Sequence, residues 1–150
     1  MAIIISFSIL VYWTSTTDYT DLKSHRLHSL EHLNEITRKI LAAAFKVHTE
    51  LGPGLLESSY KSCLYYVMSK SQLLVEKEKP LPLVYEEVRL DIGYRIDLFV
   101  ENKIVVETKS VECLSDVHTA QVLTYLKLSG CKIGLLINFN VADLKKGIKD

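Results

Sequence analysis

The sequence predicts one α/β domain, in which a mixed β-sheet is flanked by helices. Apolar residues recur every three to four positions between residues 34 and 70, as in amphipathic helices, and at strand spacing after Ser71. A further helix is expected between two later apolar runs, where it can carry the chain from one strand to a parallel neighbour. A length of 150 residues suits a single hydrophobic core.

Two amphipathic helices are expected at the start of this domain. Asn34 can serve as the N-cap of the first helix. Gly52 and Pro53 end it, because glycine adopts the left-handed conformation after a helix and proline cannot continue one. The second helix is predicted to begin near Gly54, with Glu57 in its first turn. The apolar stripes comprise Ile36, Ile40, Ala43, Val47 and Leu51 in the first helix, and Leu56, Tyr60, Cys63 and Val67 in the second.

Strand spacing begins after Ser71. Residues 81–85 adjoin prolines, which donate no backbone hydrogen bond, so they predict an edge or entry strand. Residues 93–100 and 104–111 are rich in residues that favour strands and predict a hairpin. Asn102, in the connecting loop, tolerates the left-handed conformation that a three-residue hairpin loop requires.

A helix is expected after this hairpin, with Ser115 or Asp116 as its N-cap and Gly130 at its end. Residues 133–138 then predict a short apolar strand, followed by a lysine-rich helix at the end of the sequence. The helix between the strands indicates that the last strand runs parallel to its partner.

The hairpin register determines where the charged side chains lie. With a three-residue loop, Asp97 stands directly opposite Glu107, and Lys109 shares their face of the sheet. Two opposed carboxylates repel unless a positive charge lies between them. Lys109 is one candidate for that charge, and a divalent cation is the other. A loop of two or four residues would instead turn Glu107 to the other face.

Several short motifs resemble those of a known protein family. Gly54, Glu57 and Tyr60 in GLLESSY match the motif that gives the GxxExxY proteins their name. These proteins are a group within the PD-(D/E)XK nuclease superfamily. The remaining superfamily motifs are resembled, in their usual order, by Asp97 in YRIDLFV, Glu107 and Lys109 in VVETK, and Gln121 and Tyr125 in QVLTY. The resemblance covers roughly residues 34–149. It implies a restriction-endonuclease-like core with the active site at the hairpin edge.

The resemblance also implies a metal-dependent nuclease that hydrolyses phosphodiester bonds in DNA, with RNA as an open alternative. Asp97 and Glu107 would ligate Mg²⁺ or Mn²⁺, and the backbone carbonyl of Thr108 would add a ligand. Such a metal neutralises phosphate oxygens and lowers the pKa of bound water. The sequence departs from the pattern at Ile96, which replaces the proline of the superfamily's name, and at Thr108, where an apolar residue is expected.

The other roles that the resemblance implies belong to three side chains. Lys109 would orient or help deprotonate the attacking water. Glu57 would complete the acidic pocket, and Gln121 would hold a metal-bound water or the substrate backbone. By itself, a strand carrying Glu107 and Lys109 would be explained by a surface ion pair. Asp97 and Glu57, aimed at the same place, favour a site.

The charge balance keeps a second function open. Eighteen basic and eighteen acidic residues give no net charge, so no global field attracts nucleic acid. This favours a catalytically inactive module that keeps the nuclease fold and binds nucleic acid or protein, because non-specific DNA affinity comes largely from cations. The intact acidic and basic motif residues favour the enzyme. A homodimer is compatible with either function.

The remaining features concern location and boundaries. The three cysteines are odd in number and form no CxxC pattern, so a reducing cytoplasm is expected. Residues 3–13 are apolar, but they are shorter than the ~18–20 residues needed to span a bilayer, so no membrane association is expected. We expect residues 1–33 to form a poorly ordered N-terminal extension and residues 34–150 to form the nuclease-like domain.

Overall fold

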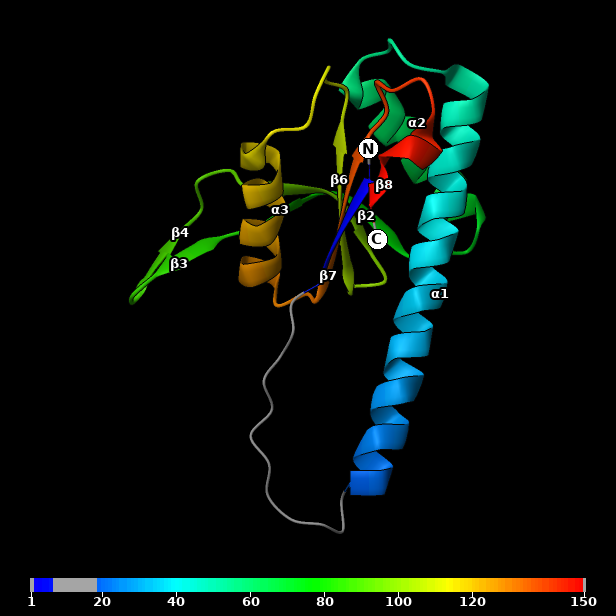
Figure 1. The fold of residues 1–150 in the computed structure, drawn as a ribbon. Helices are drawn as coiled ribbons and strands as arrows, with labels where there is room; N and C mark the ends of the chain where they lie inside the picture. Colours follow the sequence, from blue (N-terminus) through cyan, green and yellow to red (C-terminus); the bar gives the residue numbers. More distant parts are fainter. Residues whose placement is uncertain (1, 7–18, 150) are drawn as a thin grey trace.

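The computed structural model describes residues 2–6 and 19–149, and it has a mixed β-sheet between helices (Figure 1). In chain order, the elements are β1 (Ala2–Ser6), α1 (Tyr19–Leu51), α2 (Glu57–Lys70), β2 (Val75–Pro80), β3 (Leu83–Tyr85), β4 (Val88–Leu90), β5 (Arg95–Val100), β6 (Ile104–Lys109), α3 (Asp116–Ser129), β7 (Ile133–Asn138), the 3₁₀ turn η1 (Leu144–Gly147) and β8 (Ile148–Lys149). Across these residues, no helix is both long and apolar enough to cross a membrane.

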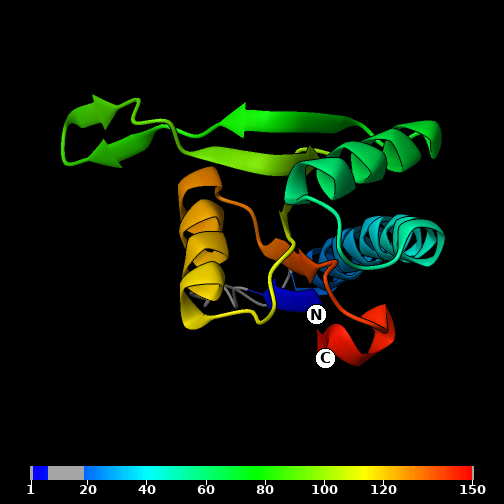
Figure 2. The same cartoon turned by 90° about the horizontal axis from the view of Figure 1, so that it is seen from above.

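In the described residues, the main sheet has the strand order β2-β5-β6-β7-β1-β8. Strands β5 and β6 are antiparallel, whereas β6 and β7 are parallel and are joined through α3. Helix α3 lies on one side of the sheet, and α1 and α2 lie on the other (Figures 1 and 2). The predicted mixed sheet flanked by helices is therefore confirmed.

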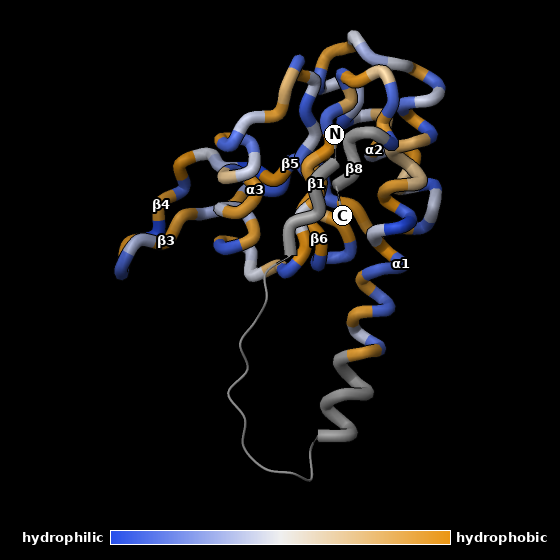
Figure 3. The backbone as a smooth tube through the Cα atoms, viewed as in Figure 1, coloured by the Kyte–Doolittle hydropathy of each residue, from blue (hydrophilic) through white to orange (hydrophobic). Residues whose placement is uncertain are grey.

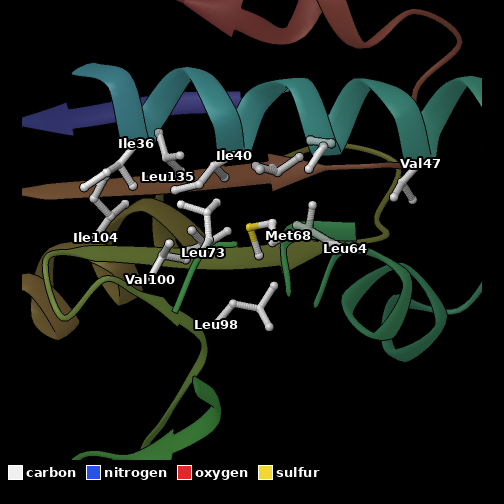
Figure 4. Packing of buried hydrophobic residues seen from close by; sticks show 14 of the residues in the cluster. Ile36, Ile40, Val47, Leu64, Met68, Leu73, Leu98, Val100, Ile104 and Leu135 are labelled. Carbon is white, nitrogen blue, oxygen red and sulfur yellow. The ribbon is translucent and has the colours of Figure 1, made fainter. Parts of the chain in front are cut away.

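Strand β6 lies at the centre of the core and is buried along its whole length. Ile104 and Val106 pack in the cluster beneath α1 and α2, where Ile36, Ile40 and Met68 also lie (Figure 4). Val105 faces the opposite way and packs in the cluster beneath α3. Because both faces are covered, the charged side chains at the end of β6 lie close to the hydrophobic core.

Helix α3 packs closely on the sheet because β7 carries a glycine at the contact. A Cβ atom on Gly134 would lie 2.5 Å from Cγ1 of Val122. The absence of a side chain at Gly134 therefore permits this close packing. The predicted end of the helix is also confirmed, since Gly130 adopts a left-handed φ of +73° after the last helical residue.

The start of α1 differs from the prediction. The helix begins at Tyr19 rather than at Asn34. Leu27 and Leu30 are exposed, and the first described buried side chain of α1 is Leu33. Strand β1, within the expected extension, pairs with β7. Most of the apolar segment 3–13 lies outside the described residues, and the domain boundary at 33–34 stays a prediction.

Three further elements were predicted incompletely or wrongly. Strand β2 pairs with β5 at the edge of the sheet, and its charged sequence VEKEKP gave no strand signal. Residues 81–85 were expected as an edge or entry strand, and within the described residues β3 pairs with β4 in a separate two-stranded hairpin. This hairpin projects from the body of the molecule and exposes apolar side chains (Figures 1 and 3). The expected lysine-rich terminal helix is only the short turn η1 followed by β8.

Candidate active site

The β5–β6 hairpin has the register that places its charged residues together. Val100 pairs with Ile104 across a three-residue loop, and Asn102 in that loop has a left-handed φ of +54°. Phe99 pairs with Val105, and both belong to the cluster beneath α3. The register ends at the pair Leu98 and Val106, next to the two candidate carboxylates at positions 97 and 107. The charge of Asp97 helps to raise the pKa of Glu107, so these two carboxylates lie close together.

Asp97 is held in place by the residue beside Glu107 on the neighbouring strand. Its Oδ2 accepts hydrogen bonds from the backbone N–H of Thr108 at 3.0 Å and from the Thr108 hydroxyl at 2.7 Å. An apolar residue at position 108 would provide only the first of these bonds. The departure from the expected motif therefore has a structural reason, which is to orient the Asp97 carboxylate.

Glu107 and Lys109 form a buried ion pair. The Nζ of Lys109 lies 2.7 Å from Oε1 of Glu107, and these side chains are only 10% and 4% exposed. The other oxygen of Glu107, Oε2, is buried and has no hydrogen-bond partner among the described residues. Burial and the nearby charge of Asp97 raise the pKa of Glu107 to about 7, although Lys109 opposes this change.

The charge state of Lys109 follows from its surroundings. Burial alone would lower the pKa of this amine, but the hydrogen bond and the charge of Glu107 raise it above its ordinary value. Lys109 therefore remains an ammonium group at neutral pH. It can orient a water molecule or offset negative charge, but it is poorly suited to accept a proton.

The glycine and tyrosine of GLLESSY build the turn that precedes α2. The Tyr60 hydroxyl donates to the carbonyl of Gly52 at 2.5 Å and accepts from the N–H of Leu55 at 3.1 Å. Its ring is fully buried and stacks on Phe139 with centroids 4.7 Å apart. Gly54 has a φ of +100°, which side chains rarely allow. Tyr60 is thus a structural residue that fixes the turn.

This turn delivers Glu57 to the end of β6. Oε2 of Glu57 accepts a hydrogen bond from the backbone N–H of Ser110 at 3.3 Å, and Oε1 lies 3.9 Å from Nζ of Lys109. The Ser110 hydroxyl donates to the carbonyl of Leu55 at 2.6 Å and ties the same turn to the strand. Glu57 therefore joins the pair formed by Glu107 and Lys109.

Helix α3 approaches the site through Tyr125. Gln121 donates a hydrogen bond to the Tyr125 hydroxyl at 3.0 Å. Burial raises the pKa of Tyr125, the bond from Gln121 opposes this, and the charge of Glu107 adds to it. Tyr125 therefore lies within electrostatic reach of the acids, and Gln121 contacts Tyr125. His118 accepts a hydrogen bond from the N–H of Ser115 through Nδ1 and so helps to cap α3.

Two further charged residues belong to this cluster and were not predicted from the sequence: Lys61, which contacts Asp97, and Glu78, which contacts Lys61. Nζ of Lys61 lies 3.0 Å from Oδ1 of Asp97 and 2.9 Å from Oε1 of Glu78. Lys61 could have been found, because it follows Glu57 by four residues and so lies on the same face of a helix. Glu78 gave no such signal, because its contact depends on strand β2, which was not predicted.

The charges of this cluster fit a divalent cation. Among the described residues, the cluster contains two ammonium groups, on Lys61 and Lys109, and four carboxylates, on Glu57, Glu78, Asp97 and Glu107. Full ionisation leaves two negative charges uncompensated, and the buried Oε2 of Glu107 is a free acceptor within the described part of the chain. These residues contain no group of three or more His, Cys, Asp or Glu side chains spaced to hold a metal. Mg²⁺ suits such a site, because it keeps several waters and needs only one or two carboxylates.

Comparison with known proteins identifies the family to which the chain belongs. Neither curated proteins nor solved structures gave a significant match. Residues 34–150 match the family model described as the PD-(D/E)XK nuclease superfamily, whose members are generally nucleases and typically use divalent metals. This match covers most of the chain and includes the whole acidic cluster. The chain belongs to the PD-(D/E)XK nuclease superfamily.

Proposed function

We propose that the protein is a metal-dependent nuclease that hydrolyses phosphodiester bonds in DNA. The observation that carries this proposal is the buried Oε2 of Glu107, which has no partner among the described residues and lies near enough to Asp97 for the charge of Asp97 to raise the pKa of Glu107. A buried carboxylate oxygen without a partner is costly, and a cation would satisfy it. The superfamily supports nuclease chemistry, and the site residues are our assignment.

The metal would be Mg²⁺ or Mn²⁺, held by Asp97, Glu107 and the backbone carbonyl of Thr108. When bound, it would polarise the phosphate and lower the pKa of a bound water molecule. The hydroxyl of Thr108 keeps the Asp97 carboxylate oriented. Lys109, which remains charged, would orient the attacking water and offset the charge that develops on the phosphate.

The remaining assignments support this chemistry. Glu57 would complete the acidic pocket, and Gln121 would bind a metal-bound water or the substrate backbone. The turn built by Gly54 and Tyr60 supports placing the chain in the GxxExxY group. A cytoplasmic location and a homodimer stay predictions, and the exposed residues Val84 and Tyr85 of the projecting hairpin are a candidate contact surface for a second copy.

A cleavage assay tests the proposal. The protein is incubated with plasmid DNA, single-stranded DNA or RNA, in the presence of Mg²⁺, Mn²⁺ or EDTA. We expect metal-dependent cleavage of DNA that is lost in Asp97→Ala and in Lys109→Ala. Lys39→Ala is the matched control, because the ion pair of Lys39 with Glu35 on α1 is exposed. Circular dichroism checks that each variant is folded. Cleavage that survives Asp97→Ala contradicts the proposed site.

One observation favours the second candidate, a catalytically inactive binding module. The ammonium group of Lys61 already occupies Oδ1 of Asp97, as it would in a site that no longer uses a metal. This candidate predicts binding of nucleic acid or protein without cleavage in any metal. It also predicts that Lys109→Ala leaves binding unchanged. The cleavage assay therefore separates the two functions.

A further inference from the structure

Lys61 reaches the candidate site from α2, outside the motifs that define the superfamily resemblance. Its ammonium group bridges Oδ1 of Asp97 and Oε1 of Glu78, at 3.0 Å and 2.9 Å. The side chains of Lys61 and Asp97 are only 14% and 13% exposed. Water screens such a pair less than it screens a surface pair, so the contact affects the charge available at Asp97.

Glu78 holds Lys61 from the opposite side. Its neighbours Lys77 and Lys79 pair with Leu98 and Ile96, so Glu78 stands opposite Asp97 across strands β2 and β5. The backbone of Glu78 has a φ of +53°, a left-handed conformation that is rare for glutamate within a strand. Such a conformation persists only where the surroundings hold it. The ion pair with Lys61 is one interaction that does so.

The Asp97 carboxylate is fully engaged in this arrangement. Oδ2 accepts two hydrogen bonds from Thr108, and Oδ1 accepts one from Lys61. A divalent cation that used Asp97 would share its carboxylate with an ammonium group about 3 Å from Oδ1. Like charges this close repel strongly where water is largely excluded. Lys61 and the cation therefore compete for the same carboxylate.

We propose that Lys61 is a positioning residue that holds Asp97 in the metal-free protein and must leave Oδ1 before a divalent cation can use this carboxylate. The proposal rests on the proposed metal-dependent function. Glu78, which is more exposed than Asp97, keeps the displaced ammonium group at the rim of the site. An ammonium group in that position faces the anionic substrate and favours its binding. Lys61 thus lowers metal affinity and supplies a positive charge for the substrate.

Isothermal titration of metal-free protein with Mn²⁺ tests this competition. Lys61→Met keeps the length of the side chain but removes its charge, and Lys39→Met is the control with an exposed ion pair. We expect Lys61→Met to bind Mn²⁺ about tenfold or more tightly than the wild type, since a competing charge is removed. Lys39→Met should match the wild type. Equal or weaker binding by Lys61→Met overturns the proposal.

Two further variants keep the result interpretable. Lys61→Gln removes only the charge and should also tighten binding, so it replaces Lys61→Met if that variant does not fold. Asp97→Ala should lose most Mn²⁺ affinity. If Asp97→Ala loses Mn²⁺ affinity but neither Lys61 variant gains it, the metal binds at Asp97 and Lys61 does not compete with it. If the wild type and all variants bind no metal, both the metal site and the competition are wrong.

Discussion

At the scale of single residues, the acidic cluster depends on one carboxylate whose environment opposes its charge. Glu107 is almost completely buried, and one of its oxygens has no partner among the described residues. Burial and the charge of Asp97 therefore raise its pKa to about 7. A group of this kind lowers the stability of the metal-free fold at neutral pH. This loss of stability is explained if the Glu107 carboxylate binds a cation.

The metal-free protein should therefore become less stable as the pH rises from about 4.5 to 7. The folded state binds the Glu107 proton more tightly than the unfolded chain does. The stabilisation of the fold by this proton is therefore complete below the unfolded pKa of ~4.3, and it is lost as the pH rises to about 7. Relative to Glu107→Gln, the wild type should lose on the order of 3 kcal/mol across this range. Urea unfolding in EDTA at a series of pH values measures the difference. Parallel pH profiles for the two proteins would show that Glu107 is not perturbed.

At the scale of elements, the turn before α2 couples a structural tyrosine to a candidate catalytic acid. The Tyr60 hydroxyl makes two hydrogen bonds to the turn, and Glu57 begins the helix that follows. The turn is also tied to the end of β6 by Ser110. The position of Glu57 therefore depends on contacts that do not include its own side chain.

Tyr60→Phe should destabilise the fold and displace Glu57. It leaves the ring stacked on Phe139 but removes both hydrogen bonds of the hydroxyl, which should cost about 1–2 kcal/mol. Tyr66→Phe is the control, because Tyr66 is 58% exposed on the same helix. The melting temperature and the rate of DNA cleavage should both fall for Tyr60→Phe and stay unchanged for Tyr66→Phe. Equal behaviour of the two variants would show that the hydroxyl of Tyr60 does not support the turn.

The elements that could be predicted are those whose sequences contain a clear pattern of apolar residues or a capping residue. The strand at residues 133–138 and the helix ended by Gly130 carry clear apolar and capping signals, and both are present. Strand β2 is charged and lies at the edge of the sheet, where its backbone pairs without an apolar pattern. The described side chains of α1 that precede Leu33 are exposed, so no apolar pattern marked the start of this helix.

The candidate site was predictable where it depends on one hairpin. The three-residue loop sets the register, and this register brings the ends of β5 and β6 that carry Asp97 and Glu107 next to each other. The contacts of Lys61 and Glu78 depend on how α2 and β2 pack on that hairpin, which no local pattern reveals. The role of Thr108 was also missed, because its hydroxyl acts across strands rather than along one.

At the scale of the whole molecule, charge is balanced overall but not locally. The chain has no net charge, whereas the candidate site has an excess of acidic groups. A phosphodiester would be repelled from such a site unless a cation bound first. The proposed function therefore depends on a divalent cation that binds between the carboxylates of Asp97 and Glu107.

The most direct test of this claim is the thermal stability of the metal-free protein during titration with Mn²⁺, compared with Glu107→Gln. A cation that binds only the folded state stabilises it by about 2.7 kcal/mol when its concentration is a hundred times the Kd. The account predicts that Tm rises by several degrees in the wild type and does not rise in Glu107→Gln. A Tm that stays constant in the wild type, or that rises equally in both proteins, would contradict it.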